Sequence, residues 1–118
     1  MAEHNFVGKI GEDLAKKFLE EKGYKIIEQN YKTKYSEIDL VTEKENELVF
    51  VEVRTKVGEN FGTPEDTLNY KKKNKIRFNA LSYAAFKKWR GPIKIDAICI
   101  VLKPNYEVLR LNHYENIV

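Results

Sequence analysis

Four charged side chains lie in two short apolar stretches of the sequence, Glu37 and Asp39 in the first and Glu52 and Arg54 in the second. Residues two apart in a β-strand point to the same face, so each stretch would direct both of its charges to one side of a sheet. Mg²⁺ prefers one or two carboxylates together with waters and phosphate oxygens. If the strands are neighbours, Asp39 and Glu52 form a candidate site for Mg²⁺ or Mn²⁺. The ordinary alternative is an exposed sheet face, on which Glu37 and Arg54 form a salt bridge and the other two carboxylates are solvated.

The elements that must position these residues are a pair of adjacent strands. The alternation of apolar and polar residues predicts strands over 36–42 and 48–54, and the polar stretch between them is typical of an antiparallel hairpin. The register that keeps the apolar residues of both strands on one face has a four-residue loop at 44–47 and places Asp39 opposite Glu52. A one-residue slip would turn the apolar face outward. The hydrophobic pattern therefore predicts that the two carboxylates are close together.

The rest of the chain supplies further strands and two helices. Apolar residues at helical spacing, with glycine, proline and capping residues at the ends, predict the boundaries. The predicted elements are a helix at 5–22, a strand at 24–31, the two hairpin strands, a loop at 55–63, a helix from 63 to about 89, and strands at 94–102 and 107–111. This order, α-β-β-β-α-β-β, predicts an α/β fold in which a mixed sheet is flanked by helices.

The composition limits the kind of protein. A length of 118 residues predicts a single domain over 1–118, and 42% hydrophobic residues is too many for a disordered chain. One Cys and two His are too few for an internal disulfide or for a zinc site of four Cys and His ligands. Apolar runs of the ~18 residues that a membrane helix needs are absent, and the first twenty residues lack the apolar stretch of a signal peptide. A cytoplasmic location is expected.

A basic segment suggests a polyanionic partner. The net charge of +3 is small, but the second predicted helix concentrates cations near its start. These cations are Lys71, Lys72, Lys73, Lys75 and Arg77. Helical spacing places Lys72 in line with the apolar inner stripe and directs the others outward, so Lys72 either snorkels or meets a charge on the sheet. The simple alternative for the segment is a solvated helix face.

Several short motifs in a fixed order give the chain a family resemblance. They are Gly11-Glu12, Gly23-Tyr24, Asn30-Tyr31, Glu37-Ile38-Asp39-Leu40, Phe50-Val51-Glu52-Val53, Lys72 and Ile95-Asp96. This pattern resembles the YraN family of predicted endonucleases, which are similar to archaeal Holliday-junction resolvases in the PD-(D/E)xK superfamily. The resemblance implies a restriction-endonuclease-like fold, a metal site at Asp39 and Glu52 assisted by Glu12, and a catalytic role for Lys72. It also implies a nucleic-acid partner, DNA more than RNA, and a homodimer.

Two positions depart from the family pattern. Ser36 stands where the family has Gly, and Arg54 stands where it has the catalytic Lys. Arginine stays charged and cannot act as a base, although it can neutralise charge on a phosphate. Lys56 lies on the same predicted strand face, two residues on. The sequence therefore predicts a metal-dependent endonuclease with Arg54 in the site, or a catalytically impaired nucleic-acid-binding module with the same fold. An adaptor that uses the loop at 55–63 is a third interpretation.

Overall fold

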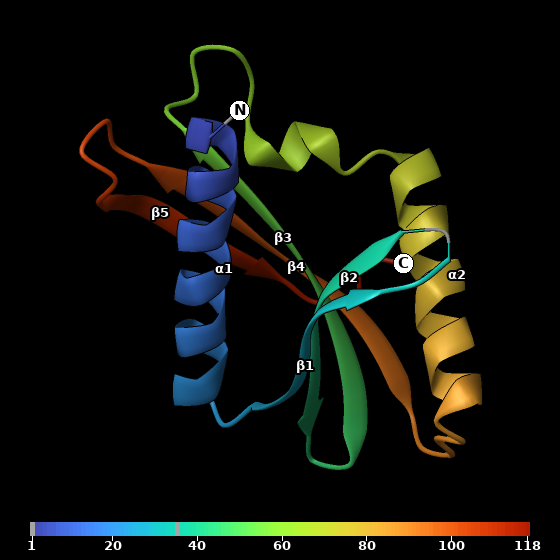
Figure 1. Ribbon diagram of the computed structural model, residues 1–118. Helices are drawn as coiled ribbons and strands as arrows, with labels where there is room; N and C mark the ends of the chain where they lie inside the picture. Colours follow the sequence, from blue (N-terminus) through green and yellow to red (C-terminus); the bar gives the residue numbers. More distant parts are fainter. Residues whose placement is uncertain (1, 35) are drawn as a thin grey trace.

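The predicted order of helices and strands is confirmed. The computed structural model describes residues 2–34 and 36–118. Its elements are α1 (Ala2–Glu21), β1 (Lys25–Lys32), β2 (Glu37–Lys44), β3 (Glu47–Val57), the 3₁₀ helix η1 (Pro64–Thr67), α2 (Tyr70–Phe86), β4 (Ile93–Leu102) and β5 (Val108–Tyr114). The chain folds as one mixed five-stranded sheet with a helix on each face (Figure 1).

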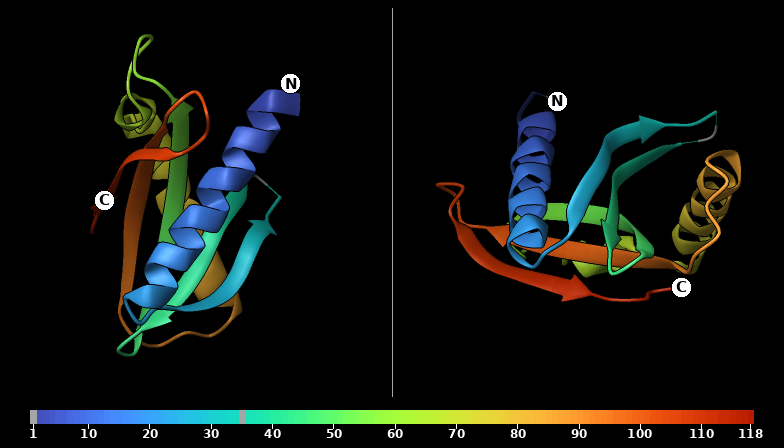
Figure 2. Two further views of the ribbon diagram at one scale, coloured as in Figure 1. Left: turned by 90° about the vertical axis from the view of Figure 1, so that its left-hand side faces the viewer. Right: turned by 90° about the horizontal axis from the view of Figure 1, so that it is seen from below.

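The sheet follows the sequence in the order β1-β2-β3-β4-β5. Its neighbours are antiparallel except for β3 and β4, which are parallel because η1 and α2 carry the chain back between them. Two buried clusters cover its faces, one with apolar residues of α1 and the other with apolar residues of α2. β3 and β4 are therefore central strands covered on both sides, and the views of Figure 2 show the two helices well apart.

The hairpin has the predicted register. Leu40 pairs with Val51, and the ladder continues to a pair between Lys44 and Glu47. The connecting loop is therefore two residues long and not the four predicted. Residues 45–46 have φ values of 52° and 66°, as a two-residue type I′ turn requires. The additional pair of Lys44 with Glu47 shortens the loop but does not shift the ladder. The side chains of both strands therefore point to the predicted faces of the sheet.

Several predicted boundaries are wrong. α1 starts at Ala2 and not at residue 5, and β5 continues to Tyr114 and does not end at 111. β3 continues to Val57 and does not end at 54, because the parallel ladder with β4 extends to the pair of Val57 with Leu102. The second helix is also not continuous from 63 to about 89. Its predicted capping box at Thr63 and Asp66 is present but begins only η1, and α2 starts separately at Tyr70 with Asn69 as its N-cap.

A glycine sets how closely α1 lies on the sheet. A Cβ at Gly11 would come within 1.7 Å of Thr55 Oγ1 on β3, so only glycine allows this approach. By contrast, a Cβ at Gly8, three residues earlier on α1, would meet nothing within 4 Å. The contact at Gly11 brings the neighbouring Glu12 to the sheet. Neither of the helices described over 2–34 and 36–118 is long and apolar enough to cross a membrane.

Candidate active site

The site lies where β2 and β3 separate. Their ladder ends at the pair of Leu40 with Val51, and beyond it the two strands diverge (Figure 1). There the backbone N–H of Val53 donates a hydrogen bond of 2.9 Å to Asp39 Oδ2. A side-chain carboxylate thus takes the place of a strand carbonyl and lies in the gap between the strands.

Three carboxylates from two elements meet at this gap. One oxygen each of Glu12 on α1 and of Glu37 and Asp39 on β2 lie within 4.8 Å of one another. Asn30 on β1 joins two of them, because its Nδ2 donates to Glu12 Oε1 at 2.9 Å and to Glu37 Oε1 at 3.2 Å. The close contact of α1 with β3 at Gly11 is what brings Glu12 to this cluster.

The fourth carboxylate, Glu52, lies beside Asp39, and the two affect each other's protonation. Burial and, second to it, the charge of Glu52 raise the pKa of Asp39 from 3.8 to about 7, while the N–H of Val53 opposes the rise. Burial likewise raises the pKa of Glu52, which is only 8% exposed, against the opposing charges of Arg54 and Lys72. Two buried acids side by side lack enough positive charge to ionise freely.

Burial also raises the pKa of Glu12, with a smaller contribution from the charge of Asp39. Carboxylate oxygens are the ligands that Mg²⁺ and Mn²⁺ favour, and a divalent cation would relieve the repulsion that raises these pKa values. The donor set of Glu12, Glu37 and Asp39, with Glu52 beside Asp39, therefore fits such an ion.

Cations of β3 and α2 face the same gap. Arg54 Nη2 lies 2.6 Å from Glu52 Oε2. Arg54 Nε is buried with no hydrogen-bond partner among the described residues. A cavity of about 240 Å³ opens beside this pair, and Lys72 and Lys75 line it together with Asp39 and Glu52. Arg54 thus pairs with Glu52 and not with Glu37, the partner that the ordinary alternative gave it.

The predicted basic residues differ in their position relative to the carboxylates. Lys72 points to the carboxylates, as its place on the inner stripe predicts, and Lys75 joins it. Lys71 and Arg77 are exposed on the outer side of α2, and Lys73 is half-exposed. Lys56 follows Arg54 along β3 and lies in a neighbouring groove.

Asp96 does not join the site. It is fully buried on the other face of the sheet, where its carboxylate contacts His113 Nε2 at 2.8 Å and accepts a hydrogen bond from the backbone N–H of Asn116 at 2.9 Å. Sequence reasoning also missed Asn30 as a bridging residue and did not place Glu37 beside Glu12. Asn30 has φ of 51°, a left-handed conformation that asparagine tolerates better than most residues. The family motif Asn30-Tyr31 marks the position in the sequence but gives Asn30 no role.

The chain was compared with protein families and with curated proteins. The model of Uncharacterised protein family UPF0102 matches residues 11–100. The chain belongs to this family. UPF0102 is the YraN family that the sequence pattern resembles, so the predicted family is confirmed.

Relatives agree over most of the chain. A UPF0102 protein of Dictyoglomus turgidum is 37% identical over 111 residues, which cover 93% of this chain and 94% of the relative. One of Caldanaerobacter subterraneus subsp. tengcongensis is 40% identical over 93% of this chain and 92% of its own length. One of Flavobacterium johnsoniae is 51% identical over a shorter stretch, 61% of this chain and 58% of the relative. The matched UPF0102 region contains every carboxylate and cation of the candidate site.

Proposed function

We propose that this chain is a metal-dependent endonuclease-like protein that hydrolyses phosphodiester bonds in nucleic acid, DNA more than RNA. The observation that carries the proposal is the buried pair of Asp39 and Glu52. Burial and, second to it, the charge of Glu52 raise the pKa of Asp39 to about 7, so the ionised form of this carboxyl is unfavourable in the folded chain. Such perturbed acids in a cleft are typical of catalytic sites.

Each acidic residue has a defined part in the proposal. Asp39 and Glu52 hold Mg²⁺ or Mn²⁺, and Glu12 assists from α1, either directly or through a water. Asn30 fixes the Glu12 carboxylate by donating to Oε1. A bound ion of this kind supplies a Lewis acid and lowers the pKa of a bound water.

The cations act on the phosphate. In phosphodiester hydrolysis a water oxygen bonds to phosphorus while the bond to the leaving oxygen breaks, and negative charge spreads over the phosphate oxygens. Arg54 Nη2 is paired with Glu52, whereas Arg54 Nε is buried without a hydrogen-bond partner among the described residues and is a donor for such oxygens. Lys72 and Lys75 flank the same cavity and attract the strand. The outward cations of α2 contact the backbone without reading bases.

The test of this proposal is cleavage of branched and single-stranded DNA in Mg²⁺ and in Mn²⁺. We expect the wild-type chain to cleave and Asp39→Asn to abolish cleavage and metal binding, the latter measured by calorimetry. Glu43→Gln is the matched control, because Glu43 lies on the same strand but pairs with Leu48 far from the gap. If wild type and Asp39→Asn show the same activity across metals and substrates, the assignment of the site is wrong.

A second candidate function is a nucleic-acid-binding module without turnover. It is favoured by the ion pair of Arg54 with Glu52, which engages one of the proposed metal ligands. It predicts binding that weakens steeply with salt, little effect of metal, and no cleavage. A homodimer, in which two sites face two strands, fits either function and is tested by the molecular mass in solution.

A further inference from the structure

A groove leads away from the carboxylates toward the loop that follows β3. Its volume is about 610 Å³. Glu12, Val53 and Arg54 line one part of it, and Phe61 and Gly62 line another. Val53 and Arg54 also line the cavity that holds Asp39 and Glu52, so the two spaces adjoin. A ligand bound at the carboxylates can therefore continue along this groove.

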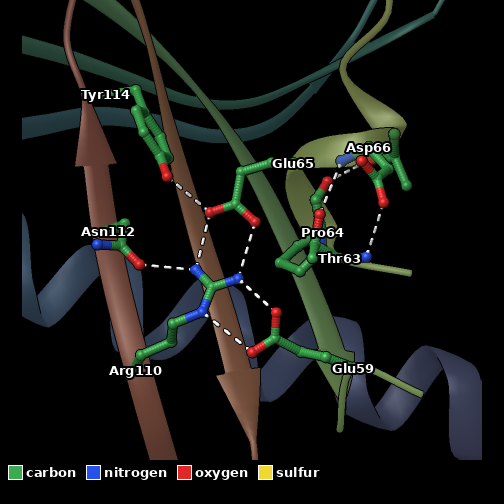
Figure 3. Close-up of polar contacts among 9 residues, drawn as sticks. Glu59, Thr63, Pro64, Glu65, Asp66, Arg110, Asn112 and Tyr114 are labelled. Atoms are coloured by element: carbon green, nitrogen blue, oxygen red, sulfur yellow. Dashed lines mark hydrogen bonds and ion pairs between the residues drawn. The ribbon is translucent and has the colours of Figure 1, made fainter. Parts of the chain in front are cut away.

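An exposed aromatic ring stands in the groove on a firmly held loop. The Phe61 side chain is 97% exposed. The backbone on both sides of it is tied to β5, because Arg110 donates two hydrogen bonds to Glu59, of 3.3 and 3.0 Å, and two to Glu65, of 2.8 and 2.9 Å (Figure 3). Lys56 Nζ lies 3.5 Å from the Phe61 carbonyl oxygen. The loop is thus fixed by polar contacts that leave the ring itself uncovered, so little ordering is needed before the ring meets a ligand.

The charges beside the ring match a nucleic-acid strand. Arg54 and Lys56 lie two residues apart on β3, and both line the groove. Cations that follow a backbone, next to an aromatic face on which a base stacks, are the usual components of a single-strand binding site. Bases inside a duplex are already stacked on each other and do not present a free face to a side chain.

We propose that Phe61 is a stacking subsite for an unpaired base of a nucleic-acid strand whose phosphates contact Arg54 and Lys56. This rests on the proposed function in taking nucleic acid as the ligand, and it adds that the strand is unpaired at the base next to the site. The subsite selects single-stranded segments, ends or junctions over continuous duplex.

The test is fluorescence anisotropy with a labelled twelve-residue oligothymidylate and a blunt duplex of the same length, in EDTA so that no cleavage occurs. Loss of one stacked base weakens binding by about tenfold. We expect Phe61→Ala to show this loss on the single strand and almost none on the duplex, and Phe61→Trp to bind at least as well as wild type. Phe86→Ala is the control, because Phe86 is 73% exposed but lies on α2.

The outcomes separate this inference from the proposed function. If Phe61→Ala binds the single strand as wild type does, or loses affinity equally for single strand and duplex, the stacking subsite is refuted. In that case the cleavage test with Asp39→Asn still decides the proposed function. If wild type binds neither probe, the stacking subsite is refuted, and the cleavage test in Mg²⁺ and Mn²⁺ still decides the proposed function. Equal melting temperatures of the Phe61 variants and wild type exclude a folding defect as the cause.

Discussion

Replacing Asp39 by asparagine should stabilise the metal-free chain while abolishing its function. The asparagine side chain has the same shape, and its amide oxygen accepts the hydrogen bond that Val53 N–H now donates to Asp39. The substitution removes the negative charge that burial and Glu52 make unfavourable. It thus eliminates a cost of the folded state without opening a cavity or leaving a donor unpaired.

The magnitude follows from the pKa of Asp39. Because the pKa is raised in the folded state, the folded chain holds a proton that the unfolded chain releases, and stability falls as pH rises between 3.8 and about 7. At 1.36 kcal/mol for each pKa unit, the full loss is about 4 kcal/mol above pH 7. Part of this belongs jointly to Glu52, whose pKa is also raised. We therefore expect Asp39→Asn to increase the free energy of unfolding at pH 8 by about 2–4 kcal/mol.

The assay is urea denaturation in EDTA at several pH values from 4 to 8. As pH rises from 4 to 8, the free energy of unfolding of wild type should fall relative to that of Asp39→Asn. The difference between the two should be smallest at pH 4. At that pH the Asp39 carboxyl is protonated in the folded chain and half protonated in the unfolded chain. Glu43→Gln should follow wild type. Mg²⁺ at pH 8 should stabilise wild type and not Asp39→Asn, because only the wild type retains the full ligand set. Parallel stability curves for wild type and Asp39→Asn would refute the account of this buried charge.

Three further predictions concern the surroundings of the site. Arg54→Lys should raise the cleavage rate in Mg²⁺ at pH 8, because lysine loses its proton where arginine does not; a rate no higher than that of wild type contradicts this. Gly11→Ala should lower the free energy of unfolding by about 1–3 kcal/mol through overpacking against Thr55, and Thr55→Ala in the same chain should restore much of it in a denaturation assay. Arg110→Gln should speed proteolysis within residues 58–63, and it should let the pKa of Glu65 rise from about 2 toward 4.5 in an NMR titration. An unchanged pKa of Glu65 would show that Arg110 does not cause the lowering.

The strand register was predictable because it depends on local information. A buried face in a hairpin fixes the pairing, since a slip by one residue exposes every apolar side chain of the strand. The pairing of Leu40 with Val51 therefore followed from the hydrophobic pattern alone. The inward position of Lys72 followed in the same way from its spacing to apolar residues on a helix.

The geometry of the gap was not predictable, because it depends on contacts between distant parts of the chain. An extrapolated ladder places Asp39 beside Glu52 but does not show that the strands part there and that Asp39 accepts a backbone bond from Val53. The Asn30 bridge needs a left-handed residue within a strand, which no periodicity reveals. The break between η1 and α2 was also not predictable. Asn69 caps the start of α2, although the sequence on both sides of it has a continuous helical pattern.

In the proposed function, the charge balance of the site would link binding of the metal ion to binding of the nucleic acid. The described residues around the gap comprise four carboxylates and three cations: Glu12, Glu37, Asp39 and Glu52 against Arg54, Lys72 and Lys75. With every group ionised these seven groups have a net charge of −1. Burial and the charge of Glu52 raise the pKa of Asp39, and a proton on Asp39 brings the sum to zero. If these residues held a divalent cation in place of that proton, the same seven groups would have a net charge of +1. The cluster would then change from neutral to positive, so in the proposed function binding of the ion and binding of the nucleic-acid strand would reinforce each other through electrostatics.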